Sequence, residues 1–158
     1  MIEYDSFAIA FLPTLNPIIA SAKLNSMVID LTRKTVVAFT DDDEDDYLIY
    51  SDVIRSVSDN IQLVYLDSCD ALLQYLQQHT PDLMFLDINL GGMSGVDCIK
   101  HIRLTHSAEK LPIIIQSTDA SQSVIDQCMN YGANYYLAKP KNLSLLEQQV
   151  RELFGREW

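Results

Sequence analysis

The sequence predicts an α/β fold built on a doubly wound parallel sheet with helices on both of its faces. From residue 35 onward, short runs rich in β-branched and aromatic residues alternate with longer segments whose apolar residues recur at helical spacing. The run at 35–40 is almost continuously apolar, which is typical of a strand buried on both faces. With 158 residues, 48% of them apolar, the chain is long enough for one domain with a two-sided core.

Five strand-and-helix units are expected in succession. Right-handed crossovers between parallel strands favour the flavodoxin-like order 2-1-3-4-5. In that order the carboxyl ends of the first and third strands flank the point where ligands bind. The strands are expected at 35–40, 61–66, 82–87, 111–117 and 133–138.

Caps and breakers set the helix boundaries. Ser68 is an N-cap candidate, Thr80-Pro81 ends the segment that follows it, and Gly132 is a good C′ residue for the fourth helix. We expect helices at 44–57, from 68 to about 78, at 96–104, at 121–131 and at 143–154. The residues expected to face the core are Leu48, Ile49, Val53, Ile54 and Val57 in the first helix and Leu143, Leu146, Val150, Leu153 and Phe154 in the last.

The charge of the chain excludes one class of function. A formal net charge of −11 leaves no basic surface for direct binding to DNA or RNA. Part of the acidic excess lies at 41–46. For residues 43–46 a solvated helix start is a sufficient explanation, because carboxylates are favourable near a helix N-terminus.

The cysteines and histidines predict neither a disulfide framework nor a transition-metal site. Cys69, Cys98 and Cys128 are widely spaced among apolar neighbours, so we expect reduced thiols in the core. His101 and His106 are five residues apart, which puts them on different faces of a helix.

The N-terminal part contains an apolar run at 7–22. A signal peptide is one interpretation, but the run follows acidic residues and is interrupted by Pro13 and Pro17, so it is too broken to span a bilayer. We therefore expect no membrane span, an extension at 1–34, one domain at 35–155 and a tail at 156–158. The apolar run is expected to pack on the domain or on a second copy, which would make a homodimer.

Chemistry-bearing residues stand where four of the expected strands end. Asp41 and Asp42 follow the first strand, Asp87 ends the third, Ser117 ends the fourth and Lys139 ends the fifth. Three carboxylates at one sheet edge repel each other unless a hard cation with oxygen ligands, most simply Mg²⁺, lies among them. The lysine offers a compact positive charge, and the serine a hydroxyl, to a phosphoryl group. Taken singly these residues have ordinary explanations, such as capping or strand termination, but together they predict a phosphoryl-accepting site.

Four ordered motifs, FTDDDEDD, PDLMFLDINLGGMSG, LPIIIQSTDA and GANYYLAKP, make residues 35–155 resemble the CheY-like receiver domain of two-component response regulators. The resemblance implies that Asp87 is the phosphoacceptor. It further implies that Asp41 and Asp42 organise Mg²⁺ together with Asp87 and the backbone carbonyl of Asn89.

The same resemblance assigns the remaining roles. Ser117 is the hydroxyl that contacts the phosphoryl group, Lys139 is its ion-pair partner and Tyr136 is the aromatic switch residue. The protein would catalyse only its own phosphorylation and dephosphorylation, and so would not be an enzyme acting on other substrates. Its partners would be a sensor histidine kinase or a histidine phosphotransfer protein of a phosphorelay, and a downstream protein target, in the cytoplasm.

Two positions depart from the family pattern. Gly91 stands where proline is usual, and Ser94 where an acidic or amide residue is common. We expect these changes to loosen the loop after Asp87 without removing a catalytic group. We expect a stand-alone receiver. One alternative is a docking module that does not cycle phosphate. Another is a small phosphatase with Asp87 as nucleophile, although Asn89 stands where such an enzyme needs a second acid.

Overall fold

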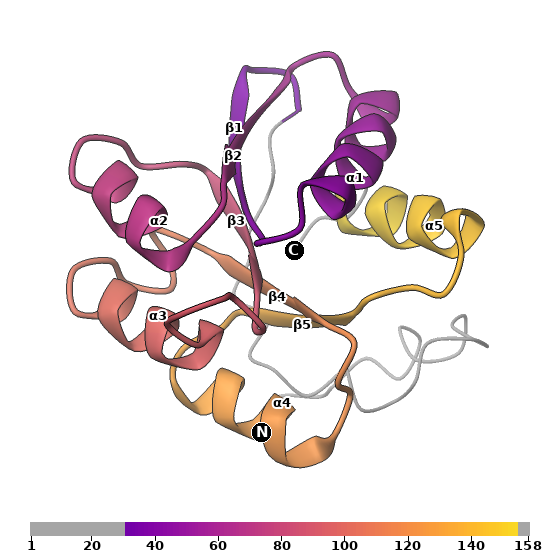
Figure 1. Cartoon of the computed structure of the whole chain (residues 1–158). Helices are drawn as coiled ribbons and strands as arrows, with labels where there is room; N and C mark the ends of the chain where they lie inside the picture. Colours follow the sequence, from indigo (N-terminus) through magenta and orange to yellow (C-terminus); the bar gives the residue numbers. More distant parts are fainter. Residues whose placement is uncertain (1–30, 155–158) are drawn as a thin grey trace, which may run out of the picture.

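The computed structural model describes residues 31–154, which form one five-stranded sheet flanked by helices (Figure 1). Every strand pair is parallel, and the order β2-β1-β3-β4-β5 confirms the expected topology. The fourth and fifth strands begin two residues later than expected. The strands are β1 (Thr35–Thr40), β2 (Ile61–Leu66), β3 (Leu83–Asp87), β4 (Ile113–Ser117) and β5 (Tyr135–Ala138).

The helices divide between the two faces of the sheet. Figure 1 shows α1 and α5 on one face and α2, α3 and α4 on the other. The Ser68 side chain accepts a hydrogen bond from the backbone N–H of Ala71, which confirms Ser68 as the N-cap of α2. Gly132, with φ of 102°, follows α4 in a conformation that L side chains rarely adopt. The helices are α1 (Glu44–Val57), α2 (Cys69–Leu76), α3 (Gly95–Arg103), α4 (Gln122–Asn130) and α5 (Leu143–Phe154).

Two apolar clusters, one on each face, bury the central strands. Every residue of β3 and β4 is buried, because helices cover both sides of these strands. On the α1 and α5 face, the ring of Phe39 lies 5.8 Å from that of Phe85 and 5.1 Å from that of Tyr50. The polar residues that follow these strands are therefore attached to a closely packed core.

The predicted core-facing residues of α1 and α5 are partly wrong. Leu48 and Ile49 are 51% and 49% exposed, whereas Tyr50 is buried at 3%. Tyr50 lies three and four positions before Val53 and Ile54, so it takes the centre of the buried face of α1 and turns Leu48 to the opposite side. In α5 the burial begins only at Leu146, and the first residue, Leu143, is 55% exposed.

The expectation of three reduced thiols is wrong for two of the cysteines. Cys69, the first residue of α2, and Cys98, in the first turns of α3, form a disulfide with a Cα–Cα distance of 5.9 Å. The two lie 29 residues apart in sequence, and they meet because α2 and α3 are neighbours on one face of the sheet. Cys128 remains a free, buried thiol, and burial raises its pKa to about 11.

A hydrogen-bonded clamp formed by Arg103 and Asn134 ties the amino ends of β4 and β5 to α3. The Arg103 guanidinium donates to the carbonyls of Gly132 and Leu111 at 2.8 Å and 2.9 Å and to Asn134 Oδ1 at 3.0 Å. The same Asn134 oxygen accepts from the backbone N–H of Ile113 at 2.9 Å. This end of the sheet is thus fixed by side chains as well as by the strand ladder.

The N-terminal expectations lie outside the described residues. These include the apolar run at 7–22, its packing on the domain or on a second copy, and most of the extension at 1–34; the tail at 156–158 lies outside as well. Among residues 31–154, no helix is long and apolar enough to cross a membrane.

Candidate phosphoryl-accepting site

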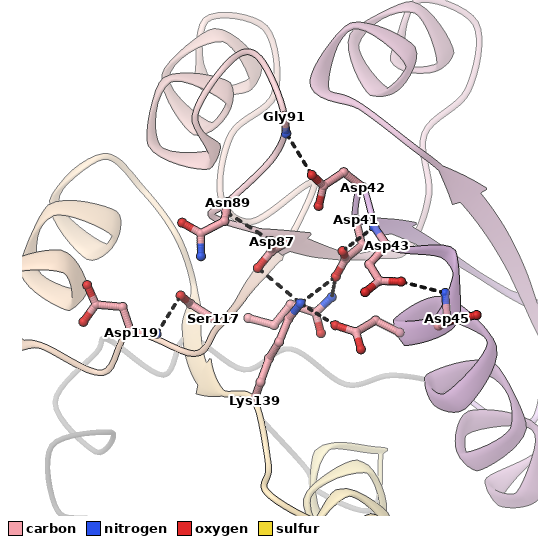
Figure 2. Close-up of polar contacts among 12 residues, drawn as sticks. Asp41, Asp42, Asp43, Asp45, Asp87, Asn89, Gly91, Ser117, Asp119 and Lys139 are labelled. Atoms are coloured by element: carbon pink, nitrogen blue, oxygen red, sulfur yellow. Dashed lines mark hydrogen bonds and ion pairs between the residues drawn. The ribbon is translucent and has the colours of Figure 1, made fainter.

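The strand register brings the expected site residues to one edge of the sheet. Thr40 pairs with Leu86 in neighbouring strands, so Asp41 and Asp87, the next residue in each chain segment, emerge side by side. Ser117 at the end of β4 pairs with Ala138 of β5, which Lys139 follows directly. Figure 2 shows the resulting group, with Lys139 pointing toward Asp41 and Asp87.

Three carboxylates form a compact acidic cluster at this edge. One oxygen from each of Asp41, Asp42 and Asp87 lies within 4.8 Å of the others. Asp41 and Asp87 are 0% and 3% exposed, whereas Asp42 is exposed. Burial is the main reason why the pKa values of Asp41 and Asp87 are raised above the usual value, although Lys139 opposes the shift.

Lys139 is shared among carboxylates. Its Nζ lies 2.8 Å from Asp41 Oδ2, 2.7 Å from Asp46 Oδ2 and 3.5 Å from Asp87 Oδ1. Burial by itself would lower the lysine pKa, but the hydrogen bonds to Asp41 and Asp46 outweigh it and raise the pKa. The Lys139 ammonium group therefore stays charged at neutral pH.

The residues of the cluster fit a hard divalent cation. Asp87 Oδ1 is buried and has no hydrogen-bond partner, since Lys139 at 3.5 Å contributes only charge. Lys139 pairs with three carboxylates, and Asp42 adds a fourth to the site, so negative charge is in excess. The cluster offers only oxygen atoms as ligands, and one of these buried oxygens has no hydrogen bond. Such a set matches the ligand preference of Mg²⁺.

Short-range hydrogen bonds hold the acidic residues in place. Asp41 Oδ1 accepts from the backbone N–H of Asp43 at 3.0 Å, and Asp43 in turn caps α1 by accepting from the N–H of Asp45. Asp42 Oδ2 accepts from the N–H of Gly91 at 3.1 Å, which links the loop after β1 to the loop after β3. These contacts orient the carboxylates without a ligand.

The loop after Asp87 is packed tightly against the start of α3. The N–H of Asn89 donates to Asp87 Oδ2 at 3.1 Å, and the N–H of Gly95 donates to the carbonyl of Ile88 at 2.8 Å. A Cβ atom on Gly95 would lie 2.5 Å from the Asp87 carbonyl oxygen, so no larger residue fits there without backbone movement. The expected ligand role of the Asn89 carbonyl remains a prediction, with Asn89 two residues from the phosphoacceptor candidate.

Ser117 and Tyr136 are both joined to the loop after β4. Ser117 is fully buried, and its Oγ accepts from the N–H of Asp119 at 3.1 Å. The Tyr136 hydroxyl donates to the carbonyl of Asp119, and the residue is 3% exposed. The ring of the expected switch residue therefore already lies inside the protein.

Two residues that contact the site, Asp46 and Gln116, are not among those predicted from the sequence. The acidic run predicts only a solvated helix start for Asp46, yet this carboxylate holds Lys139. Gln116 is fully buried, and its Nε2 lies 3.5 Å from Asp41 Oδ2. A polar residue inside the apolar run at 113–117 is the signal that points to Gln116, because a buried amide needs a partner.

The fold and this acidic edge define a doubly wound α/β protein whose cluster of carboxylates fits a hard divalent cation. Residues 37–151 match the family model described as the response regulator receiver domain, and the chain belongs to this family. Receiver domains are signalling switches that accept a phosphoryl group, bind Mg²⁺ at an aspartate cluster and interact with histidine kinases and downstream targets; they are generally not enzymes.

Curated relatives are consistent with this membership, and solved structures share the fold. Chemotaxis protein CheY-3 of Vibrio cholerae is 29% identical over 84 residues, which cover 53% of this chain and 65% of CheY-3. A protein-glutamate methylesterase/protein-glutamine glutaminase of Trichodesmium erythraeum is 30% identical over 112 residues, 67% of this chain but 31% of that protein. The matches thus span less than two thirds of these relatives.

Among crystal structures, the phosphorylated cyanobacterial phytochrome response regulator RcpA superposes with a TM-score of 0.69 at 22% identity, over 75% of this chain and 90% of that one. A putative response regulator from Chloroflexus aurantiacus gives a TM-score of 0.65 at 26% identity, over 78% of this chain and 100% of that one.

Proposed function

We propose that this chain is a phosphoacceptor switch in which Asp87 takes a phosphoryl group from a phosphohistidine of a kinase or a histidine phosphotransfer protein. The observation that carries the proposal is the state of Asp87 itself. Its carboxylate is buried, one of its oxygens lacks a hydrogen bond, and it lies between a lysine and two further acids. A carboxylate kept this way is available as a nucleophile.

The transfer step requires little of the protein beyond position and charge. An Asp87 carboxylate oxygen forms a bond to phosphorus while the phosphorus–nitrogen bond of the phosphohistidine breaks, and the imidazole nitrogen keeps the electron pair of that bond. Lys139 neutralises charge on the phosphoryl oxygens. Mg²⁺, held by Asp41, Asp42, Asp87 and the backbone carbonyl of Asn89, would supply the remaining positive charge.

The response to phosphorylation would involve Ser117, Lys139 and Tyr136. The Ser117 hydroxyl can turn from Asp119 toward the phosphoryl oxygens, which loosens the start of the loop that leads to α4. Since Tyr136 is already buried, inward movement of its ring is not needed; the phosphoryl group would instead stabilise this placement. The surface of α4, β5 and α5 would then shift in population rather than refold.

The setting proposed for this switch is a cytoplasmic phosphorelay with a protein as its downstream target. A net charge of −11 makes direct binding to nucleic acid unfavourable.

The test is covalent labelling by a small phosphodonor. The protein is incubated with Mg²⁺ and acetyl phosphate, and intact mass is measured for the wild type, Asp87→Asn and the exposed-site control Asp52→Asn. We expect one acid-stable, base-labile phosphoryl adduct in the wild type and in Asp52→Asn, none in Asp87→Asn, and none without Mg²⁺. Equal labelling of Asp87→Asn would reject Asp87 as the acceptor. No labelling of a folded wild type would favour a docking module that does not cycle phosphate.

A further inference from the structure

Asp46 stands apart from the other acids of the run at 42–46. Asp42, Asp43, Glu44 and Asp45 are exposed, whereas the Asp46 side chain is 34% exposed. Asp46 Oδ2 makes the shortest of the three contacts to Lys139 Nζ, at 2.7 Å. A helix-start role does not account for a carboxylate directed at the lysine of the site.

The three contacts of Lys139 are unequal in a way that bears on the chemistry. Asp41 and Asp46 both hold the ammonium group at hydrogen-bond distance, while Asp87 is 3.5 Å away and its Oδ1 is left without a hydrogen bond. The lysine is thus bound by the two carboxylates that do not react. Two of the three N–H donors of the ammonium group are therefore committed to Asp41 and Asp46, and one is left for a phosphoryl oxygen.

We propose that Asp46 is a positioning residue that restrains Lys139 in the unphosphorylated state and competes with the phosphoryl group for it. This inference rests on the proposed role of Asp87 as the phosphoacceptor. Asp46 also adds a negative charge beside the place where the dianionic phosphoryl group must sit. Both effects disfavour phosphoryl occupancy, so Asp46 sets how readily the site fills and empties.

Loss of Asp46 would release the lysine without losing it from the site. Asp41 Oδ2 still holds Nζ at 2.8 Å, and the Lys139 side chain is only 14% exposed. With Asp46 neutral, a second N–H donor and more of the ammonium charge become available to a phosphoryl group on Asp87. An ion pair with a partly exposed carboxylate is worth about a fivefold change in an equilibrium constant.

The experiment measures beryllofluoride affinity at saturating Mg²⁺ by fluorine NMR for wild type, Asp46→Asn, Asp46→Glu and Asp45→Asn. Asp45→Asn is the matched control, because it removes the same charge from the neighbouring exposed residue, whose carboxylate is not among those paired with Lys139. We expect about fivefold tighter binding for Asp46→Asn, with Asp45→Asn close to wild type and Asp46→Glu restoring most of the wild-type value. In lysine-labelled protein, the Lys139 ammonium signal should shift in Asp46→Asn before beryllofluoride is added.

The outcomes separate this inference from the proposed function. If wild type binds beryllofluoride but Asp46→Asn binds it with equal or lower affinity, Asp46 does not compete for Lys139 and the inference fails. It fails equally if Asp45→Asn has the same effect as Asp46→Asn, since charge alone would then explain the result. If folded wild type binds no beryllofluoride and takes no phosphoryl group from acetyl phosphate, the proposed function fails and this inference fails with it.

Discussion

Replacement of Gly95 by alanine tests the link between the start of α3 and the phosphoacceptor candidate. The added Cβ would lie 2.5 Å from the carbonyl oxygen of Asp87 and 2.6 Å from Cα of Ile88, where ordinary contacts are 3.4–4 Å. Both atoms belong to the backbone, so the helix or the loop has to move by about 1 Å, at an overpacking cost of about 1–3 kcal/mol. Because the displaced backbone includes that of Asp87, phosphorylation of Gly95→Ala should also be slower than that of wild type.

The assay is urea unfolding of Gly95→Ala beside Gly91→Ala, a control in the same loop. There the new Cβ would lie 3.3 Å from Oδ2 of Asp42, an exposed residue whose carboxylate can shift more easily than backbone. We expect Gly91→Ala to change the free energy of unfolding by less than about 0.5 kcal/mol. If Gly95→Ala is as stable as wild type, the close approach of α3 to Asp87 does not constrain residue 95.

The cysteines and the acidic cluster lead to four further predictions. Thiol labelling of unfolded, unreduced protein should modify Cys128 alone, and labelling after reduction should modify Cys69 and Cys98 as well; three reactive thiols before reduction would contradict the disulfide. Reduction should lower the free energy of unfolding by about 3.5 kcal/mol from loop-closure entropy, a loss that the Cys69→Ser, Cys98→Ser double variant should share while no longer responding to reductant. In metal-free buffer, the raised pKa of Asp87 in the folded protein means that ionisation of this carboxyl destabilises the fold. The free energy of unfolding of wild type should therefore fall relative to that of Asp87→Asn as the pH rises from 3.8 through the raised pKa. Mg²⁺ should stabilise wild type by up to about 2.7 kcal/mol at a concentration one hundred times its dissociation constant, and Asp87→Asn by much less. Equal stabilisation of the two proteins by Mg²⁺ would contradict the cation assignment.

The alternation of strands and helices was readable from the sequence because buried parallel strands are apolar throughout. Strand order and most element boundaries follow from that pattern and from caps such as Ser68. The pattern failed where an aromatic residue replaced aliphatic ones at the helix–sheet contact. The apolar pattern predicts that Leu48 and Ile49 face the sheet, but Tyr50 does so instead. Which residues of α1 contact the sheet depends on the rotation of the helix about its axis and not on hydropathy alone.

The acidic cluster could be predicted because each of its members ends a strand or follows one within two residues. Residues that reach the site from elsewhere could not. Asp46 arrives from the first turn of α1, in a run of acids that composition does not distinguish, and only the position of Lys139 singles it out. The disulfide was missed for a related reason: no local spacing shows that the starts of α2 and α3 lie together.

The clamp around Arg103 fixes the end of the sheet that lies away from the acidic cluster. Its guanidinium and the side chain of Asn134 fasten the amino ends of β4 and β5, while Ser117 and Lys139 lie at the opposite ends of the same strands. At the carboxyl ends the two strands are joined by their backbone ladder, which continues to the bond from Lys139 N–H to the Ser117 carbonyl at 2.8 Å. We therefore expect a change at the carboxyl edge to move the loop after β4 and α4 and to leave the strand register intact.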